Sequence, residues 1–412
     1  MRTYAILRAV LISTVFCLSL SVSASFVLGQ DVGADVGGGA GIFRPKNPET
    51  KKKPKSTTPV TKPSSRTGSP RTKGPAVEDR IEDLLDKGNE ARDARRFTEA
   101  EEDYQGVLKL KPKDARAAYG LGNVYSDQQR WDDAEAAYRN ATTWAPTNAD
   151  ANVALSVVLS QPRAGGDQAK RFADAELFAR KAVQIDPKNA VAWDRLGVAL
   201  QARGIQTSET EHCYRRAIEM DPQFAVAYAH LARLLNRTSR QAEAVPLYEK
   251  ATELAKDPDT LNLIAESLQA EQLWPASEPV LKRSLELDGR NPTSLVLMGR
   301  YLIVYKKYSE AEPLLKTATE VSPRSFLPLN LLGRAYLAMD RFSDAEATYE
   351  RASSFATVGE RKQLAGVYGF EGVGDGYMKA RQKENAARVY QRALELDPGN
   401  SNITQKLASA RK

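Results

Sequence analysis

Hydrophobic and small residues recur at helical spacing through most of the chain, and one pattern returns at long intervals. Residues 117–146 are AAYGLGNVYSDQQRWDDAEAAYRNATTWAP, and residues 327–352 are LPLNLLGRAYLAMDRFSDAEATYERA. Both stretches place Leu, Gly, Tyr, an aromatic residue, Ala, Tyr and Ala at the same spacing. Apolar positions three and four residues apart indicate amphipathic helices. The chain is therefore expected to be helical from about Val77 onward, without strands.

The recurring pattern is about 34 residues long and occurs nine times. We place the nine repeats at residues 81–114, 115–148, 149–189, 190–224, 225–257, 258–291, 292–325, 326–359 and 367–400. The third repeat has a seven-residue insertion around PRAGGDQ, and the fourth has one extra residue. Residues 360–366 separate the last two repeats.

Small and aromatic residues mark fixed positions of each repeat. The eighth position is small in every repeat: Gly88, Gly122, Ser156, Gly197, Ala232, Ala265, Gly299, Gly333 and Gly374. The twenty-fourth is tyrosine in six repeats: Tyr104, Tyr138, Tyr214, Tyr248, Tyr349 and Tyr390. Glycine inside a helix costs about 1 kcal/mol relative to alanine. Its recurrence predicts that two helices approach closely there, with the tyrosines filling the space between repeats.

A helix–turn–helix repeat of this length, with these small residues and tyrosines and with a proline near the end of six repeats, resembles the tetratricopeptide repeat family. The resemblance implies an all-α fold, a right-handed α-solenoid superhelix of about nine repeats over residues 78–400. Residues 401–412 carry Ile403, Leu407 and Ala410 at helical spacing. They predict a capping helix that covers the last exposed face.

The same resemblance implies a binding site on the concave face, where positions two, five, nine and twelve of each first helix tend to face a groove. Carried over to this chain, the peptide-binding candidates are Asn89, Asn123, Asp194, Arg233, Asn262, Arg300, Asn330 and Arg334. Asparagine can satisfy the main chain of an extended peptide, and arginine can hold a carboxylate through two hydrogen bonds. The implied partner is a protein or extended peptide, with an acidic or C-terminal segment suited to the arginines. The alternative for the arginines is a solvated helix face.

The N-terminus has the pattern of an export signal. Arg2 and Arg8 precede an apolar stretch at residues 9–20, and small residues follow. We expect residues 1–29 to be a signal peptide, with cleavage after Ala24 or Gly29. The alternative is a retained anchor, because residues 9–28 are about long enough to span a membrane. The expected location is periplasmic or secreted, with membrane association under the alternative.

Residues 30–77 are expected to form a disordered linker, first glycine-rich and then rich in Pro, Ser, Thr and Lys. Residues 44–77 hold ten Lys or Arg against Glu49, so the net charge of +7 is concentrated there. The repeats are close to neutral, which gives no indication of a nucleic-acid partner. A stretch with so few large apolar residues cannot fold alone. Residues 44–73 are either a soluble spacer or a contact for a membrane or an anionic polymer.

No constellation of residues indicates catalysis, a metal or a cofactor. His212 and His230 are the only histidines, and no two cysteines have the spacing needed to bind one metal ion together. Asp132 and Asp133 fit the start of a helix better than a catalytic dyad. The glycine-rich stretch at 369–379 has no preceding strand and lacks the Lys-Ser or Lys-Thr of a phosphate loop. We therefore expect no enzymatic activity.

These observations favour an exported, non-catalytic scaffold that mediates protein–protein interaction through its groove. The alternative is an envelope-tethered or membrane-tethered assembly factor, held by an uncleaved N-terminus or by the basic linker.

Overall fold

The computed structural model describes residues 45–50, 77–161, 167–205 and 207–412. The expected signal peptide and most of the expected linker lie outside these residues. The described residues divide after Thr238 into a first unit and a second unit, residues 239–412. Both units contain helices and, within the described residues, no strand. The predicted all-helical fold class is thus confirmed.

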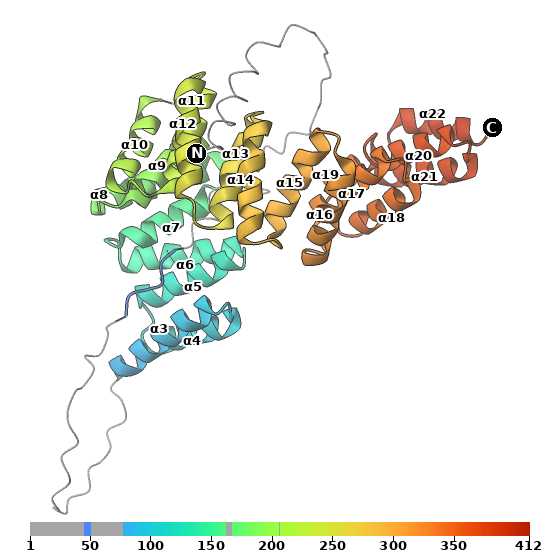
Figure 1. The fold of residues 1–412 in the computed structure, drawn as a ribbon. Coiled ribbons are helices and arrows are strands. Elements are labelled where there is room, and N and C mark those ends of the chain that lie inside the picture. Colours follow the sequence, from blue (N-terminus) through green and yellow to red (C-terminus); the bar gives the residue numbers. More distant parts are fainter. Residues whose placement is uncertain (1–44, 51–76, 162–166, 206) are drawn as a thin grey trace, which may run out of the picture. The chain divides into compact units, whose positions relative to one another are not determined.

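The first unit is a stack of helix pairs (Figure 1). Its helices are α3 (Val77–Asp93), α4 (Phe97–Leu110), α5 (Ala115–Asp127), α6 (Trp131–Trp144), α7 (Ala149–Leu159), α8 (Gln168–Ile185), α9 (Ala190–Ala202), α10 (Ser208–Met220) and α11 (Ala225–Arg237). Each second helix also packs on the first helix of the next repeat, as α4 does on α5. This continuous packing is what a solenoid needs to bury its core.

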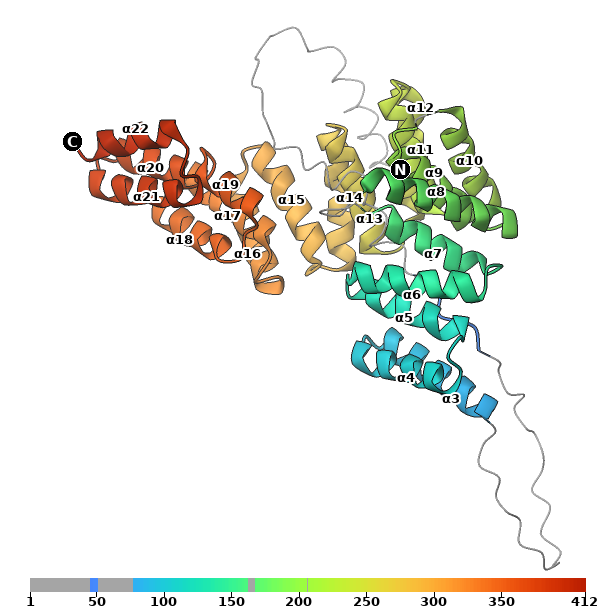
Figure 2. The same ribbon diagram turned by 180° about the vertical axis from the view of Figure 1, so that it is seen from behind.

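The second unit continues the same pattern (Figure 2). Its helices are α12 (Gln241–Leu254), α13 (Pro258–Ala270), α14 (Trp274–Leu287), α15 (Pro292–Val304), α16 (Tyr308–Val321), α17 (Phe326–Ala338), α18 (Phe342–Ser353), α19 (Val358–Ala365), α20 (Phe370–Lys379), α21 (Lys383–Leu396) and α22 (Ser401–Ala410). The expected capping helix is α22, which packs on α21 and buries Ile403 and Leu407.

One element was not expected. Residues 360–366, placed between the last two repeats, contribute to helix α19. Thr357 and Glu360 form a capping box at its start, since each side chain bonds the other residue's main chain. The glycine-rich stretch belongs to α20, as predicted, and its glycines allow close packing. A Cβ atom at Gly376 would lie 2.2 Å from Cε1 of Phe342 on α18.

The eighth position packs against the twenty-fourth within the same repeat. A Cβ atom at Gly122 would lie 2.4 Å from Cε1 of Tyr138, which is too close for any side chain. The same contact joins Gly88 with Tyr104, Gly197 with Tyr214, Gly333 with Tyr349 and Gly374 with Tyr390. Tyr104 also faces Gly120 on the next repeat, so the tyrosine fills the space within and between repeats. The recurring glycines are therefore explained by close approach.

The helices begin and end at regular signals. Side chains of Asp or Asn accept main-chain N–H groups at the start of helices: Asp114, Asn148, Asp167, Asn189, Asp257, Asn291 and Asn400. Such caps stabilise a helix by about 1 kcal/mol each. The fifteenth position of most repeats has positive φ: Arg95, Gln129, Gly204, Ser239, Gln272, Lys306, Asp340 and Arg381. This left-handed residue ends the first helix and starts the turn.

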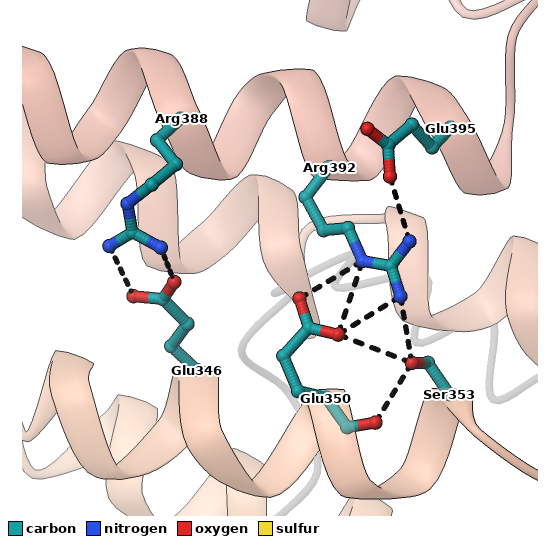
Figure 3. A network of polar contacts seen from close by, with 6 residues as sticks. All are labelled: Glu346, Glu350, Ser353, Arg388, Arg392 and Glu395. Atoms are coloured by element: carbon teal, nitrogen blue, oxygen red, sulfur yellow. Dashed lines mark hydrogen bonds and ion pairs between the residues drawn. The ribbon is translucent and has the colours of Figure 1, made fainter.

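Ion pairs fasten α21 to α18 (Figure 3). Arg392 Nε donates to Glu350 Oε1 at 2.9 Å, and its Nη2 donates to Ser353 Oγ at 3.1 Å. Arg388 Nη2 donates to Glu346 Oε2 at 3.0 Å. These side chains are partly exposed to solvent, so each pair contributes at most about 1 kcal/mol. They orient the last repeat more than they stabilise it.

Candidate peptide groove

Residues 45–50, drawn in blue in Figure 1, lie against α3 and α5, the first helices of the first two repeats. Asn123 Nδ2, on α5, donates to the main-chain oxygen of Lys46 at 2.9 Å. Asn89 Nδ2, on α3, donates to that of Pro48 at 3.1 Å. Arg92 Nη1, also on α3, donates to that of Pro45 at 2.8 Å. We call the surface formed by Asn89, Arg92, Arg116 and Asn123 the N-terminal groove.

The side chains that hold this segment are themselves held from behind. Tyr104 donates its hydroxyl proton to Asn89 Oδ1 at 2.8 Å, and Tyr138 donates to Asn123 Oδ1 at 2.9 Å. With its oxygen engaged by a tyrosine, each amide turns its NH₂ group toward the segment. Burial raises the pKa of both tyrosines, which therefore stay protonated and can donate. The tyrosines that pack on the glycines thus also orient the groove.

Arg92 is fixed in a similar way. Its Nε and Nη2 donate to the two carboxylate oxygens of Asp127 at 2.8 and 3.2 Å. Such a paired contact sets the plane of the guanidinium. Nη1 then faces the segment, where it also donates to Asn47 Oδ1 at 2.9 Å. With only 1% of its surface exposed, Arg92 is among the largest fully buried residues of the described chain.

Every third residue of the segment is buried. Pro45 and Pro48 are buried, whereas Lys46 and Glu49 are exposed. Burial of every third residue is the pattern of polyproline II, which has three residues per turn and no internal hydrogen bonds. A cavity of about 340 Å³ remains beside Pro48 and Glu49, lined also by Arg116, Tyr119 and Asp150. The segment therefore does not fill the space available to it.

Comparison with known families identifies the repeat. Models described as tetratricopeptide repeat match residues 85–155, 213–245, 302–358 and 373–400, in both units. The chain is a tetratricopeptide repeat protein. Repeats of this family support a role as a protein-interaction scaffold. No curated protein matches the chain in sequence.

Several solved structures are similar to this tetratricopeptide repeat protein. The MamA protein is 22% identical over 42% of this chain and 91% of its own, with a TM-score of 0.36. TTC0263 of Thermus thermophilus is 21% identical over 46% of this chain and 99% of its own, with a TM-score of 0.40. YrrB, described as having an unusual peptide-binding site, is 21% identical over 46% and 90%, with a TM-score of 0.35.

Of the predicted groove residues, Asn89 and Asn123 contact residues 45–50. Two further residues that contact this segment were not predicted from the sequence. Arg92 stands at position twelve of the first tetratricopeptide repeat, and Arg116 stands at position two of the second. Arg116 Nη1 lies 3.5 Å from the main-chain oxygen of Glu49 and donates to Glu82 Oε1 at 2.8 Å. Both positions were expected to face the groove, so the family register was the signal that could have found them.

Asp194 and Arg233, the other predicted residues of the first unit, are buried. Asp194 Oδ1 lies 2.8 Å from His230 Nδ1, and its Oδ2 lies 2.6 Å from Arg195 Nη2. Arg233 is 7% exposed, and its Nη2 lies 3.5 Å from Gln201 Oε1. Asp194 therefore belongs to a buried polar cluster and is not displayed to a ligand.

In the second unit, the predicted asparagines are also buried. Asn262 Nδ2 donates to Asn291 Oδ1 at 3.1 Å, and its Oδ1 accepts from the hydroxyls of Ser284 and Ser294. The side-chain amide of Asn262 therefore forms hydrogen bonds inside the protein. Asn330 on α17 is 3% exposed.

The predicted arginines of the second unit are half-buried on the first helices α15 and α17. Arg300 Nε donates to Gln269 Oε1 at 2.8 Å, and its guanidinium lies 5.8 Å from the ring centre of Trp274. Arg334 lies 4.9 Å from the ring centre of Tyr368. Both charges are positioned by neighbouring side chains, as in the N-terminal groove.

Within the described residues, no cluster of His, Cys, Asp or Glu could hold a metal ion. In the same part of the chain, no helix has the length and apolar character to cross a membrane. Cys213 is buried, and burial raises the pKa of its thiol to about 12, so it stays protonated at neutral pH. Asp132 and Asp133 lie in the first turn of α6, as predicted.

Proposed function

We propose that this tetratricopeptide repeat protein is an exported, non-catalytic scaffold that binds extended protein segments along the first helices of its repeats. One observation carries the proposal: Asn89 and Asn123 donate hydrogen bonds to the main chain of an extended segment. Both stand at position nine, and each is oriented by a tyrosine of its own repeat. Recognition of this kind needs an extended main chain and no catalytic group.

Arg300 and Arg334 occupy position nine of the seventh and eighth repeats. An arginine at this position can hold a carboxylate by two hydrogen bonds. We therefore assign the second unit an acidic segment or a free C-terminus as its partner. Arg233 is left out of this surface because it is buried.

Charge reversal at Arg300 and Arg334 tests this function. The Arg300→Glu, Arg334→Glu chain should bind its partners at least about tenfold more weakly, because attraction is replaced by repulsion. Immobilised full chain is incubated with extract of the native host, and captured proteins are quantified by mass spectrometry. The matched control is Arg290→Glu, Arg324→Glu, which makes the same charge change at two exposed loop residues. If both variants capture the same proteins as the wild type at unchanged affinity, the groove assignment in the second unit is wrong.

Export is the second part of the proposal, and it has its own test. We expect intact-mass measurement of the protein from its native host to show an N-terminus at Ser25 or Gln30. A mass that retains Met1, found in the membrane fraction, would instead support the alternative of an envelope-tethered assembly factor. The basic stretch at residues 44–73 would then act as a second membrane contact.

A further inference from the structure

We propose that residues 45–50 are a resident ligand of the N-terminal groove, and that the groove's external partner is a basic, extended segment with the same Pro-x-x-Pro spacing. That partner must displace the resident segment before it can bind. This inference rests on the proposed function, because it names the ligand class and the regulation of the same kind of site. Four features of the groove support it.

The first feature is that the groove recognises main chain. Three oxygens of the segment, those of Pro45, Lys46 and Pro48, accept hydrogen bonds from Arg92, Asn123 and Asn89. Main-chain oxygens are the same in every peptide, so these contacts would serve an external segment equally well. The donors are also fixed in advance by Tyr104, Tyr138 and Asp127. A preorganised site loses little entropy when it binds.

The second feature is that the groove selects its ligand by the spacing of two prolines and by the side chain of Asn47. The groove covers Pro45 and Pro48 and leaves the residues after each of them exposed. Proline favours the extended conformation before binding, which reduces the cost of ordering the peptide. The side chain of Asn47 is read by hydrogen bonds, since Arg92 donates to its oxygen and its Nδ2 donates to Asp93 Oδ2 at 2.9 Å. The preferred ligand is therefore Pro-x-Asn-Pro.

The third feature is complementary charge. Helix α3 carries seven acidic residues and three basic ones. Residues 44–53 carry five basic residues and one acidic residue, Glu49. The acidic residues of α3 would attract an external ligand with basic flanks and repel an acidic ligand. The N-terminal groove thus favours a basic ligand, whereas the surface with Arg300 and Arg334 is assigned an acidic one.

The fourth feature is the space beside the resident segment, which an external ligand could use to displace it. The cavity of about 340 Å³ beside Pro48 is lined by Arg116, Tyr119 and Asp150, which a larger ligand could contact. Residues 51–76 connect the segment covalently to α3. Short linkers give effective concentrations on the order of millimolar. If the segment alone has a Kd of about 0.1 mM, an effective concentration of about 1 mM lowers the affinity of an external peptide about elevenfold.

A labelled peptide tests this competition. The probe is a fluorescein-labelled peptide of residues 44–51, and its binding to the full chain is measured by fluorescence anisotropy. The Pro45→Ser, Pro48→Ser chain should bind the probe at least about tenfold more tightly than the wild type, because its own segment no longer competes. A probe with the same two serines should bind neither chain.

The groove itself is tested by adding Asn89→Asp and Asn123→Asp to the proline variant. Aspartate keeps the oxygen that accepts from tyrosine and removes the NH₂ donor. The fold accepts aspartate here, because Tyr390 donates to Asp375 Oδ1 at 2.6 Å in the ninth repeat. Helicity should be unchanged, and probe affinity should fall at least about tenfold.

Three outcomes would overturn the inference. The wild type and the proline variant would bind the probe equally, the Asp variant would keep full affinity, or sedimentation would show a wild-type dimer that the proline changes dissociate. The last result would place the segment in a second copy of the chain. If partner capture is still lost on charge reversal at Arg300 and Arg334, the scaffold function of the second unit stands without the N-terminal groove.

Discussion

Asp194→Ala is expected to lower the free energy of unfolding by about 3–5 kcal/mol, the cost of removing one member of a buried ion pair. The carboxylate is fully buried, 2.8 Å from His230 Nδ1 and 2.6 Å from Arg195 Nη2. Arg195 is 4% exposed, so it cannot recover its hydration when the carboxylate is removed. The measurement is urea denaturation at pH 7, followed by circular dichroism.

The matched control is Asp194→Asn, which keeps the size of the side chain and one oxygen acceptor. It removes the charge and replaces the second oxygen by an NH₂ group but leaves no cavity, so its loss of stability should be smaller than that of the alanine variant. If both variants unfold at the wild-type urea concentration, the cluster of Asp194, Arg195 and His230 does not stabilise the first unit.

The stabilisation by Asp194 should depend on pH. Burial alone would raise the pKa of this carboxyl, but His230 and Arg195 hold it below its usual range. A carboxyl whose pKa is depressed by folding stabilises the protein above its unfolded pKa of about 3.9 and loses this effect below it. The contribution of the Asp194 charge itself should therefore be constant from pH 7 to about 5 and shrink below about pH 4, when the wild type is compared with Asp194→Ala.

His230 adds a loss of stability that begins at a higher pH. Burial lowers the pKa of its imidazole. Arg195 and Arg233 lower this pKa as well, whereas Asp194 raises it. The folded chain therefore holds fewer protons than the unfolded chain once the pH falls below about 6.5. Stability should decline with acidification from that point, since the slope follows the difference in bound protons.

The repeats could be predicted from the sequence because their signals are local. Glycine at position eight and tyrosine at position twenty-four face each other within one helix pair, so each repeat carries the full pattern. Helix α19 was missed although Thr357 and Glu360 give the spacing of a capping box. A local signal was present there and was not used.

The site was only partly predictable because burial depends on neighbouring repeats. Asp194 and Asn262 occupy groove positions by register, yet partners from the next repeat, His230 and Ser294, hold them inside. No pattern within one repeat indicates those contacts. The docking of residues 45–50 was hidden for another reason, since most of its hydrogen bonds use main-chain oxygens, which leave no mark on the residue types.

Gly122→Leu should destabilise the first unit by about 1–3 kcal/mol through overpacking. Even the first added carbon would lie 2.4 Å from Tyr138 Cε1, and the tyrosine ring is fully buried. Either the ring or the helix must move. Asn140→Ala, an exposed change in the same repeat, should shift stability by less than about 0.5 kcal/mol. Equal urea midpoints for the two variants would contradict the assigned register.

The same substitution should also affect the N-terminal groove. Tyr138 donates to Asn123 Oδ1, so a displaced ring no longer orients the amide that holds Lys46. A chain with Gly122→Leu and the two proline changes should bind the labelled peptide more weakly than the proline variant alone. Adding Tyr138→Leu should restore part of the stability, because Gly299 packs on Leu315 at the same positions of the seventh repeat. It should not restore binding, because leucine offers no hydroxyl to Asn123. Recovery of both stability and binding would show that the tyrosine hydroxyl has no part in orienting the groove.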